Sequence, residues 1–152
     1  MRRYLVRVLS LVALLGVAGS GALALWLQQT RVTVQDLPAL RTGDLVFQES
    51  GSGQTIAIAL ASRSLYTHTG IVEIRPDGQL YVIEAAQFVQ STPLAEWIAR
   101  GTAGRITIKR LRGLTEQDAQ KILSAAHTYD GRPYDFFFHE DAESIYCSEL
   151  VQ

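Results

Sequence analysis

The chain has 152 residues, of which 47% are hydrophobic and 19% are charged, and its formal net charge at pH 7 is −1. A protein that binds nucleic acid presents a basic face to the phosphates. The run at 109–112 is the one cluster of Lys and Arg after the N-terminus, and we interpret it as the end of a strand, so the composition argues against nucleic-acid binding.

The N-terminus predicts a membrane anchor or a signal peptide. Three arginines precede an uncharged, apolar run at 8–27, and a helix of that length spans about 30 Å, enough to cross a bilayer core. Small residues at 22–24 would permit cleavage, but the run exceeds an ordinary signal-peptide core, and we favour an uncleaved anchor. The arginines keep the N-terminus in the cytoplasm, so the remaining chain is expected outside the cytoplasmic membrane, or free in the periplasm after cleavage.

The remaining chain suits one domain. We divide the sequence into the N-terminal segment at 1–30, a linker at 31–41 and a domain at 42–152. About 120 residues lie beyond the N-terminal segment, which is within the usual size of a single domain.

The first half of this domain predicts strands, with one helix. A Gly-Asp turn opens a short strand within 42–50, and a Gly- and Ser-rich loop follows it. The run at 55–63 alternates like a strand, but its length and alanine content favour a helix. Two β-rich runs at 69–75 and 79–85 flank Pro-Asp-Gly, which predicts a hairpin.

The second half predicts helices around one further strand. A short helix is expected at 93–100, with Pro93 in its first turn, and an alternating strand at 104–111. Thr115 can cap the next helix, which has apolar residues at helical spacing. An aromatic loop at 131–138 then leads to the start of another helix. The class is α+β: a small antiparallel sheet, or half-barrel, with packed helices.

Cys147 is the only cysteine in the chain, and it stands where the last helix is expected to begin. A lone cysteine in an exported domain has no partner for an internal disulfide. It could be a small buried hydrophobic residue, but a helix N-terminus stabilises a thiolate, which is the nucleophilic form. A redox role is disfavoured because no second cysteine exists to resolve a mixed disulfide.

A thiolate nucleophile needs a base, and His68 is the best placed histidine. It precedes the first strand of the predicted hairpin, where a rigid sheet would position it. If the hairpin loop has three residues, Arg75 pairs with Gln79 and Glu84 lies opposite Gly70. His68 is then the diagonal neighbour of Glu84 on the same face, about 7–8 Å away between Cα atoms. A two-residue loop would place the two side chains on opposite faces.

The order of these motifs resembles that of a known family. Gly-Asp-Leu-Val-Phe at 43–47, His-Thr-Gly-Ile-Val-Glu at 68–73, Glu84 and Tyr-Cys-Ser-Glu-Leu at 146–150 follow the order of the permuted papain-like enzymes of the YiiX/YaeF type, relatives of the NlpC-type cell-wall hydrolases. The resemblance covers 42–152. It implies Cys147 as nucleophile, His68 as base and Glu84 as orienting residue, and cleavage of an amide, ester or thioester through an acyl-enzyme.

The resemblance also raises an expectation about the C-terminus. Family members continue well beyond the cysteine, whereas this sequence stops at Gln152, so we expect that a C-terminal segment is missing.

Other predicted contacts are with the substrate. Tyr66 and Tyr146 are candidate hydrogen-bond donors or pocket walls, and Tyr134 is a candidate for an acyl or peptide pocket, although each could simply pack in the core. No metal ion or cofactor is predicted. The location implies envelope substrates such as a peptidoglycan peptide, an N-acyl amide or a lipid ester. The alternative is a catalytically silent, membrane-tethered binding module of the same fold.

Overall fold

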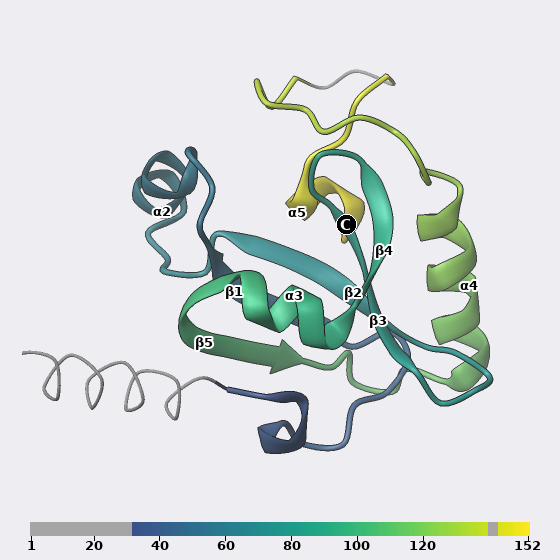
Figure 1. The fold of residues 1–152 in the computed structure, drawn as a ribbon. Helices are drawn as coiled ribbons and strands as arrows, with labels where there is room; N and C mark the ends of the chain where they lie inside the picture. Colours follow the sequence, from purple (N-terminus) through teal and green to yellow (C-terminus); the bar gives the residue numbers. More distant parts are fainter. Residues whose placement is uncertain (1–31, 140–142) are drawn as a thin grey trace, which may run out of the picture. The chain divides into compact units, whose positions relative to one another are not determined.

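The computed structural model describes residues 32–139 and 143–152, which belong to one compact unit. Its centre is a five-stranded antiparallel sheet with the order β4-β3-β2-β1-β5 (Figure 1). The strands are β1 (Leu45–Ser50), β2 (His68–Ile74), β3 (Leu80–Ala85), β4 (Val89–Pro93) and β5 (Gly101–Lys109). The helices are the 3₁₀ turn η1 (Val34–Asp36), α2 (Thr55–Ser62), α3 (Leu94–Arg100), α4 (Glu116–His127) and α5 (Cys147–Leu150).

The hairpin of β2 and β3 has the predicted register. The backbone N–H of Arg75 donates to the carbonyl of Gln79 at 2.9 Å, so the loop has three residues. Val72 lies opposite Val82, and the same register places Gly70 opposite Glu84. A Cβ atom at Gly70 would lie 2.4 Å from Val82 Cγ1, so glycine is required for this close strand pairing.

The two faces of the sheet bury separate hydrophobic clusters. On one face α3 covers a cluster centred on Trp97, which is fully buried. On the other face α4 and α5 contribute to a second cluster. The first cluster contains Val46, Val72, Val82, Leu94, Trp97 and Ile98. The second contains Ile71, Ile83, Ala85, Val89, Leu123, Ala126, Ile145 and Leu150. The sheet is thereby fixed on both sides, which gives the side chains at its edge a rigid support.

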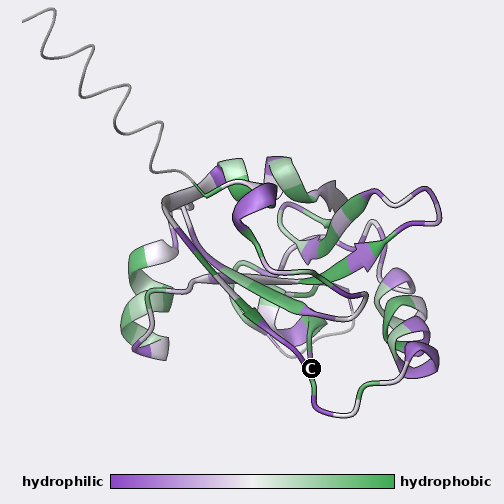
Figure 2. Ribbon diagram, turned by 90° about the horizontal axis from the view of Figure 1, so that it is seen from below, coloured by the Kyte–Doolittle hydropathy of each residue, from purple (hydrophilic) through white to green (hydrophobic). Residues whose placement is uncertain are grey.

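The predicted helices are present. Thr115 caps α4 by accepting a hydrogen bond from the N–H of Asp118 at 3.2 Å, as expected. Pro93 is the N-cap of α3 rather than a residue of its first turn. Helix α2 forms at the ambiguous alanine-rich run, and none of its residues is buried. Figure 2 shows α2 hydrophobic over most of its length, whereas α4 has hydrophobic and hydrophilic sides.

Two segments differ from the sequence-based expectation. Strand β4 was not predicted, because its sequence Val-Gln-Ser-Thr-Pro is mostly polar and ends in proline; it is an edge strand, where both are tolerated. Part of the predicted linker packs on the domain, since Val34, Leu37 and Leu40 contact the cluster around Trp97.

The predicted anchor at 8–27 lies outside the described residues. Within residues 32–139 and 143–152, no helix combines the length and the apolar character needed to cross a membrane.

Candidate active site

His68 and Glu84 meet at the end of the β2–β3 pair. The imidazole Nε2 lies 2.6 Å from Glu84 Oε2, so the diagonal contact predicted from the hairpin register is confirmed. Glu84 is fully buried and only 11% of the His68 side chain is exposed. A carboxylate in this position fixes the rotation of the imidazole and favours its charged form.

Glu84 has two further partners, which sequence reasoning did not identify. Its Oε1 accepts hydrogen bonds from the hydroxyl of Thr92 at 2.6 Å and from the guanidinium of Arg100. Burial alone would raise the pKa of Glu84, but its partners, first of all His68, outweigh this effect and lower the pKa to about 2. Glu84 is therefore an anion throughout the neutral range. Arg100 ends α3 and Thr92 lies on the unpredicted β4, so their approach to Glu84 depends on tertiary packing.

Cys147 reaches the same place from α5. It is the first residue of that helix, and only 7% of its surface is exposed. The side chains of His68 and Tyr134 and the backbone of Thr69 lie close enough to its sulfur to stabilise a thiolate and lower the pKa of the thiol. Because Glu84 occupies Nε2 of His68, Nδ1 is the ring nitrogen left to interact with the sulfur. The structure thus brings together all three residues that the sequence assigned to acid–base and nucleophilic chemistry.

The electrostatics of this group favour a charge-separated pair. Burial would lower the pKa of His68, but its hydrogen bonds and charge interactions with Cys147 and Glu84 raise it to about 9. Burial would likewise raise the pKa of the Cys147 thiol, and the hydrogen bond and positive charge of His68 bring it below its usual value. A raised imidazole pKa beside a lowered thiol pKa describes a thiolate next to an imidazolium.

Trp97 covers the histidine. The two ring centroids are 6.1 Å apart and the planes are inclined by 29°. Trp97 is fully buried in the cluster under α3, so it holds one side of the imidazole and keeps water from the bond between His68 and Glu84.

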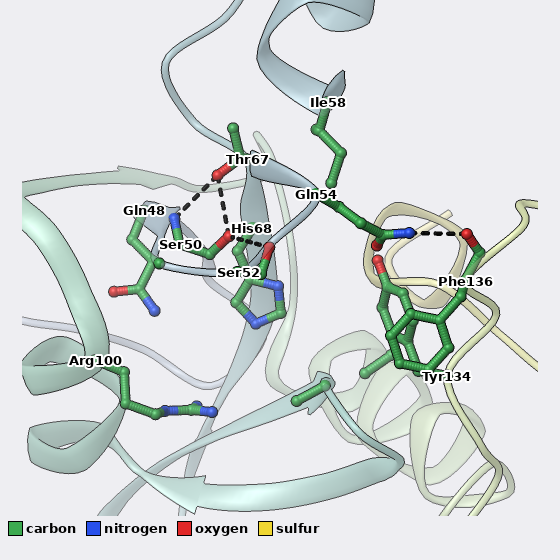
Figure 3. Close-up of a pocket in the computed structure, with 13 residues that line it drawn as sticks. Gln48, Ser50, Ser52, Gln54, Ile58, Thr67, His68, Arg100, Tyr134 and Phe136 are labelled. Carbon is green, nitrogen blue, oxygen red and sulfur yellow. Dashed lines mark hydrogen bonds between the residues drawn. The ribbon is translucent and has the colours of Figure 1, made fainter. Parts of the chain in front are cut away.

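A cavity of about 380 Å³ opens beside His68. Figure 3 shows its lining residues, which come from β1, α2 and the loop before it, the start of β2, the end of β3, α3 and the aromatic loop. One wall is polar and includes Gln48, Ser50 and Thr67, whose hydroxyls and backbone are hydrogen-bonded to one another. Ile58 and Phe136 are apolar parts of the lining. A substrate in this cavity would lie against the histidine.

The three predicted tyrosines do not share one location. Tyr134 lines the cavity and lies near enough to Cys147 for the two groups to influence each other's pKa. Burial, together with the charge of Cys147, raises the pKa of Tyr134, so it remains a hydrogen-bond donor. Tyr66 accepts a hydrogen bond from Thr107 at 2.6 Å and Tyr146 packs edge-on against Phe138; neither lines this cavity.

The described residues offer no obvious site for a metal ion. Among residues 32–139 and 143–152, no three His, Cys, Asp or Glu side chains are grouped as metal ligands would be. Thr92 and Arg100 already occupy the second oxygen of Glu84.

Comparisons with known proteins agree with this architecture. A model of the permuted papain-like amidase enzymes of the YaeF/YiiX type, the C92 family, matches residues 39–152. The chain is 44% identical over 112 residues to the uncharacterized protein YiiX of Escherichia coli strain K12, an alignment that covers 73% of this chain and 55% of that protein. It is also similar to the crystal structure of metalloprotein yiiX from Escherichia coli O157:H7, with a TM-score of 0.70 and 44% identity over 73% of this chain and 62% of that one.

The chain therefore spans less than two thirds of the length of these relatives. The family model nevertheless covers β1, the hairpin that carries His68 and Glu84, and the helix that begins at Cys147. On the extent of that match, the chain belongs to the family of permuted papain-like amidases of the YaeF/YiiX type.

Proposed function

We propose that this protein is a cysteine hydrolase that cleaves an amide or ester bond through a covalent acyl-enzyme. The observation that carries the proposal is the chain of contacts from Cys147 through His68 to the buried carboxylate of Glu84, beside a cavity large enough for part of a substrate. Membership in an amidase family supports the same reaction class.

The reaction begins with the thiolate of Cys147 attacking the substrate carbonyl. The imidazolium of His68 then gives its proton to the leaving amine or alcohol, and the acyl group remains on the sulfur. In the second half, neutral His68 takes a proton from water, which attacks the thioester and releases the acid. Glu84 stabilises the imidazolium and holds its Nδ1 toward the sulfur throughout.

The tetrahedral intermediate needs hydrogen-bond donors for its oxyanion. We assign this role to the hydroxyl of Tyr134 and the backbone N–H of Cys147. Tyr134 lies near the sulfur and lines the cavity, and the first N–H groups of a helix have no acceptor within the helix.

The relative from Escherichia coli O157:H7 is described as a metalloprotein. We carry no metal step over to this chain, because its described His, Cys, Asp and Glu residues form no group that would hold an ion. Each step above uses only protein groups and water.

Location and substrate class are proposals from the sequence. The apolar run at 8–27 would tether the domain to the outer face of the cytoplasmic membrane, or direct it to the periplasm if it is cleaved. Substrates there would be envelope amides or esters, such as a peptidoglycan peptide, an N-acyl amide or a lipid ester.

Alkylation by iodoacetamide tests whether Cys147 is activated. We expect fast labelling near neutral pH in the wild-type chain and slow labelling in the variant His68→Ala, because the thiolate loses its cationic partner. The matched control is His127→Ala, which removes a histidine of α4 that is hydrogen-bonded to Glu73 and Asp130 away from the cavity. Labelling as slow as that of an ordinary thiol in every form would contradict the proposal and favour a non-catalytic binding module.

A further inference from the structure

Gln48 is a buried amide without a partner, beside the candidate active site. It lies directly opposite His68 in the β1–β2 pair and lines the cavity. Only 2% of the surface of Gln48 is exposed, yet its side chain forms no hydrogen bond with any described residue. Its Oε1 is buried and unpaired. The amide nitrogen of Gln48 likewise has no hydrogen-bond partner among the described residues, so it is a donor beside the cavity that a ligand can engage.

The orientation of the amide shows which of its atoms can reach a ligand. Oε1 is turned to the backbone of Gly101, where an added Cβ would lie only 2.3 Å away. The amide nitrogen is therefore the atom left for the cavity, and it is a hydrogen-bond donor. Gly101 provides the space for this arrangement because it has no side chain.

Arg100 supplies a second set of donors at the same end of the cavity. Its guanidinium uses Nη2 to bind Glu84, and its other N–H groups have no hydrogen-bond partner among the described residues. Its side chain is 46% exposed. Figure 3 shows Arg100 and Gln48 extending toward the same region near His68, and no acidic side chain of the described residues lines the cavity. The end of the cavity thus offers N–H donors and a positive charge.

We propose that Gln48 and Arg100 form a subsite that binds a carboxylate of the substrate close to the bond that is cleaved. This inference rests on the proposed hydrolase function and narrows its substrates to peptides or N-acyl amino acids that carry a carboxylate near the scissile carbonyl. A guanidinium and an amide N–H recognise a carboxylate by charge-assisted hydrogen bonds. A neutral lipid ester would leave both groups unpaired.

Two alkylating reagents test the subsite directly. Iodoacetate and iodoacetamide both react when a thiolate displaces iodide, and they differ only in carrying a carboxylate or an amide. We divide the rate with iodoacetate by the rate with iodoacetamide, both measured on the full chain. This ratio cancels any change in the reactivity of Cys147 itself. We expect a higher ratio for the wild-type chain than for free glutathione.

Substitutions in the subsite should lower this ratio. We expect Arg100→Met to lower it at least about fivefold, and Gln48→Met, which keeps the shape of the side chain, about threefold, because each variant loses a charge-assisted hydrogen bond to the carboxylate. The matched control is Arg105→Met, which removes one positive charge from β5 but pairs with Glu49 outside the cavity. It should leave the ratio unchanged.

The outcomes separate this inference from the proposed function. Fast reaction with iodoacetamide and equal ratios in the wild type, Arg100→Met and Gln48→Met would refute the subsite while leaving the activated thiol intact. Slow reaction with both reagents in the wild type would refute the function. If Arg100→Met does not fold, as measured by thermal unfolding, the ratio for Gln48→Met decides the matter alone.

Protection against alkylation identifies the source of the carboxylate. N-acetylalanine presents a main-chain carboxylate, and N-acetylisoglutamine presents only a side-chain carboxylate. Protection by one of them and not by neutral N-acetylalaninamide supports the subsite and names the source. Equal protection by all three compounds, or by none, contradicts it.

Discussion

Replacing Glu84 by glutamine should lower the pKa of His68 by a predictable amount. The pKa of His68 is raised from 6.5 to about 9, which corresponds to about 3 kcal/mol in favour of the imidazolium. Cys147 and Glu84 share this effect. The hydrogen bond that the imidazolium donates to Glu84 is 2.6 Å long and the carboxylate is fully buried, and a hydrogen bond to a charged group contributes about 1.5–3 kcal/mol. We therefore expect Glu84→Gln to lower the pKa of His68 by about 1 to 2 units.

Histidine NMR titration measures this change. Signals in a chain with labelled imidazoles are assigned by the loss of one signal in His68→Ala. The wild-type signal of His68 should titrate near pH 9, and that of Glu84→Gln clearly below it. The matched control is Glu73→Gln, which should lower the pKa of His127, its partner at 3.3 Å, and leave His68 unchanged. A His68 titration that is the same with and without the Glu84 carboxylate would refute the reasoning.

Three further predictions test neighbouring parts of the account. Tyr134→Phe should slow acyl transfer from an activated ester about 100-fold, as expected for a lost oxyanion donor, and change iodoacetamide labelling much less; equal losses in both assays would argue against that role. Gly70→Ala should lower the free energy of unfolding in urea by about 1–3 kcal/mol because the new Cβ has no space, whereas Gly53→Ala, with nothing within 4 Å, serves as control. Glu84, with its pKa lowered from 4.5 to about 2, should stabilise the fold above pH 4.5, and this contribution of up to about 3 kcal/mol should be lost as the pH falls through 2. The stability that His68 contributes is complete below pH 6.5 and is lost as the pH rises through 9. The free energy of unfolding, measured between pH 2 and 9, should therefore peak at about pH 4.5–6.5, and in Glu84→Gln its decline toward acid pH should be smaller.

The contact between His68 and Glu84 could be predicted from the sequence because it depends on one local feature. Pro-Asp-Gly between two β-rich runs gives the loop length, and the loop length sets which residues share a face. The position of Cys147 could not be obtained in this way. Its distance from the hairpin along the chain is long. The expected helix N-terminus suggested a thiolate that needs a base, and the order of motifs, through the family resemblance, indicated that it joins His68 and Glu84.

The residues that sequence reasoning missed are those that reach the site through tertiary packing. Gln48 is the fourth residue of an ordinary strand, and nothing in its neighbours indicates that its amide is buried beside His68. Trp97 and Arg100 lie in a short helix whose contact with the sheet is set by the hydrophobic cluster beneath it. A strongly charged residue at the end of a helix ordinarily points to solvent, so the pairing of Arg100 with Glu84 becomes visible only in three dimensions.

The proposed subsite of Gln48 and Arg100 would restrict which substrates bind. Arg100 both pairs with Glu84 and faces the cavity, so substrate binding and the charge state of the histidine share one residue. Comparison of kcat and KM for Gln48→Met, once a substrate is known, would separate binding from chemistry.

The most direct test of the central claim is to trap the acyl-enzyme. The chain is mixed with p-nitrophenyl acetate, quenched in acid and mapped by peptide mass spectrometry. The account predicts one acetyl group on Cys147, formed rapidly in the wild type and at a much lower rate in His68→Ala. Acetylation that leaves Cys147 unmodified, or that proceeds at the same rate without His68, would contradict the account.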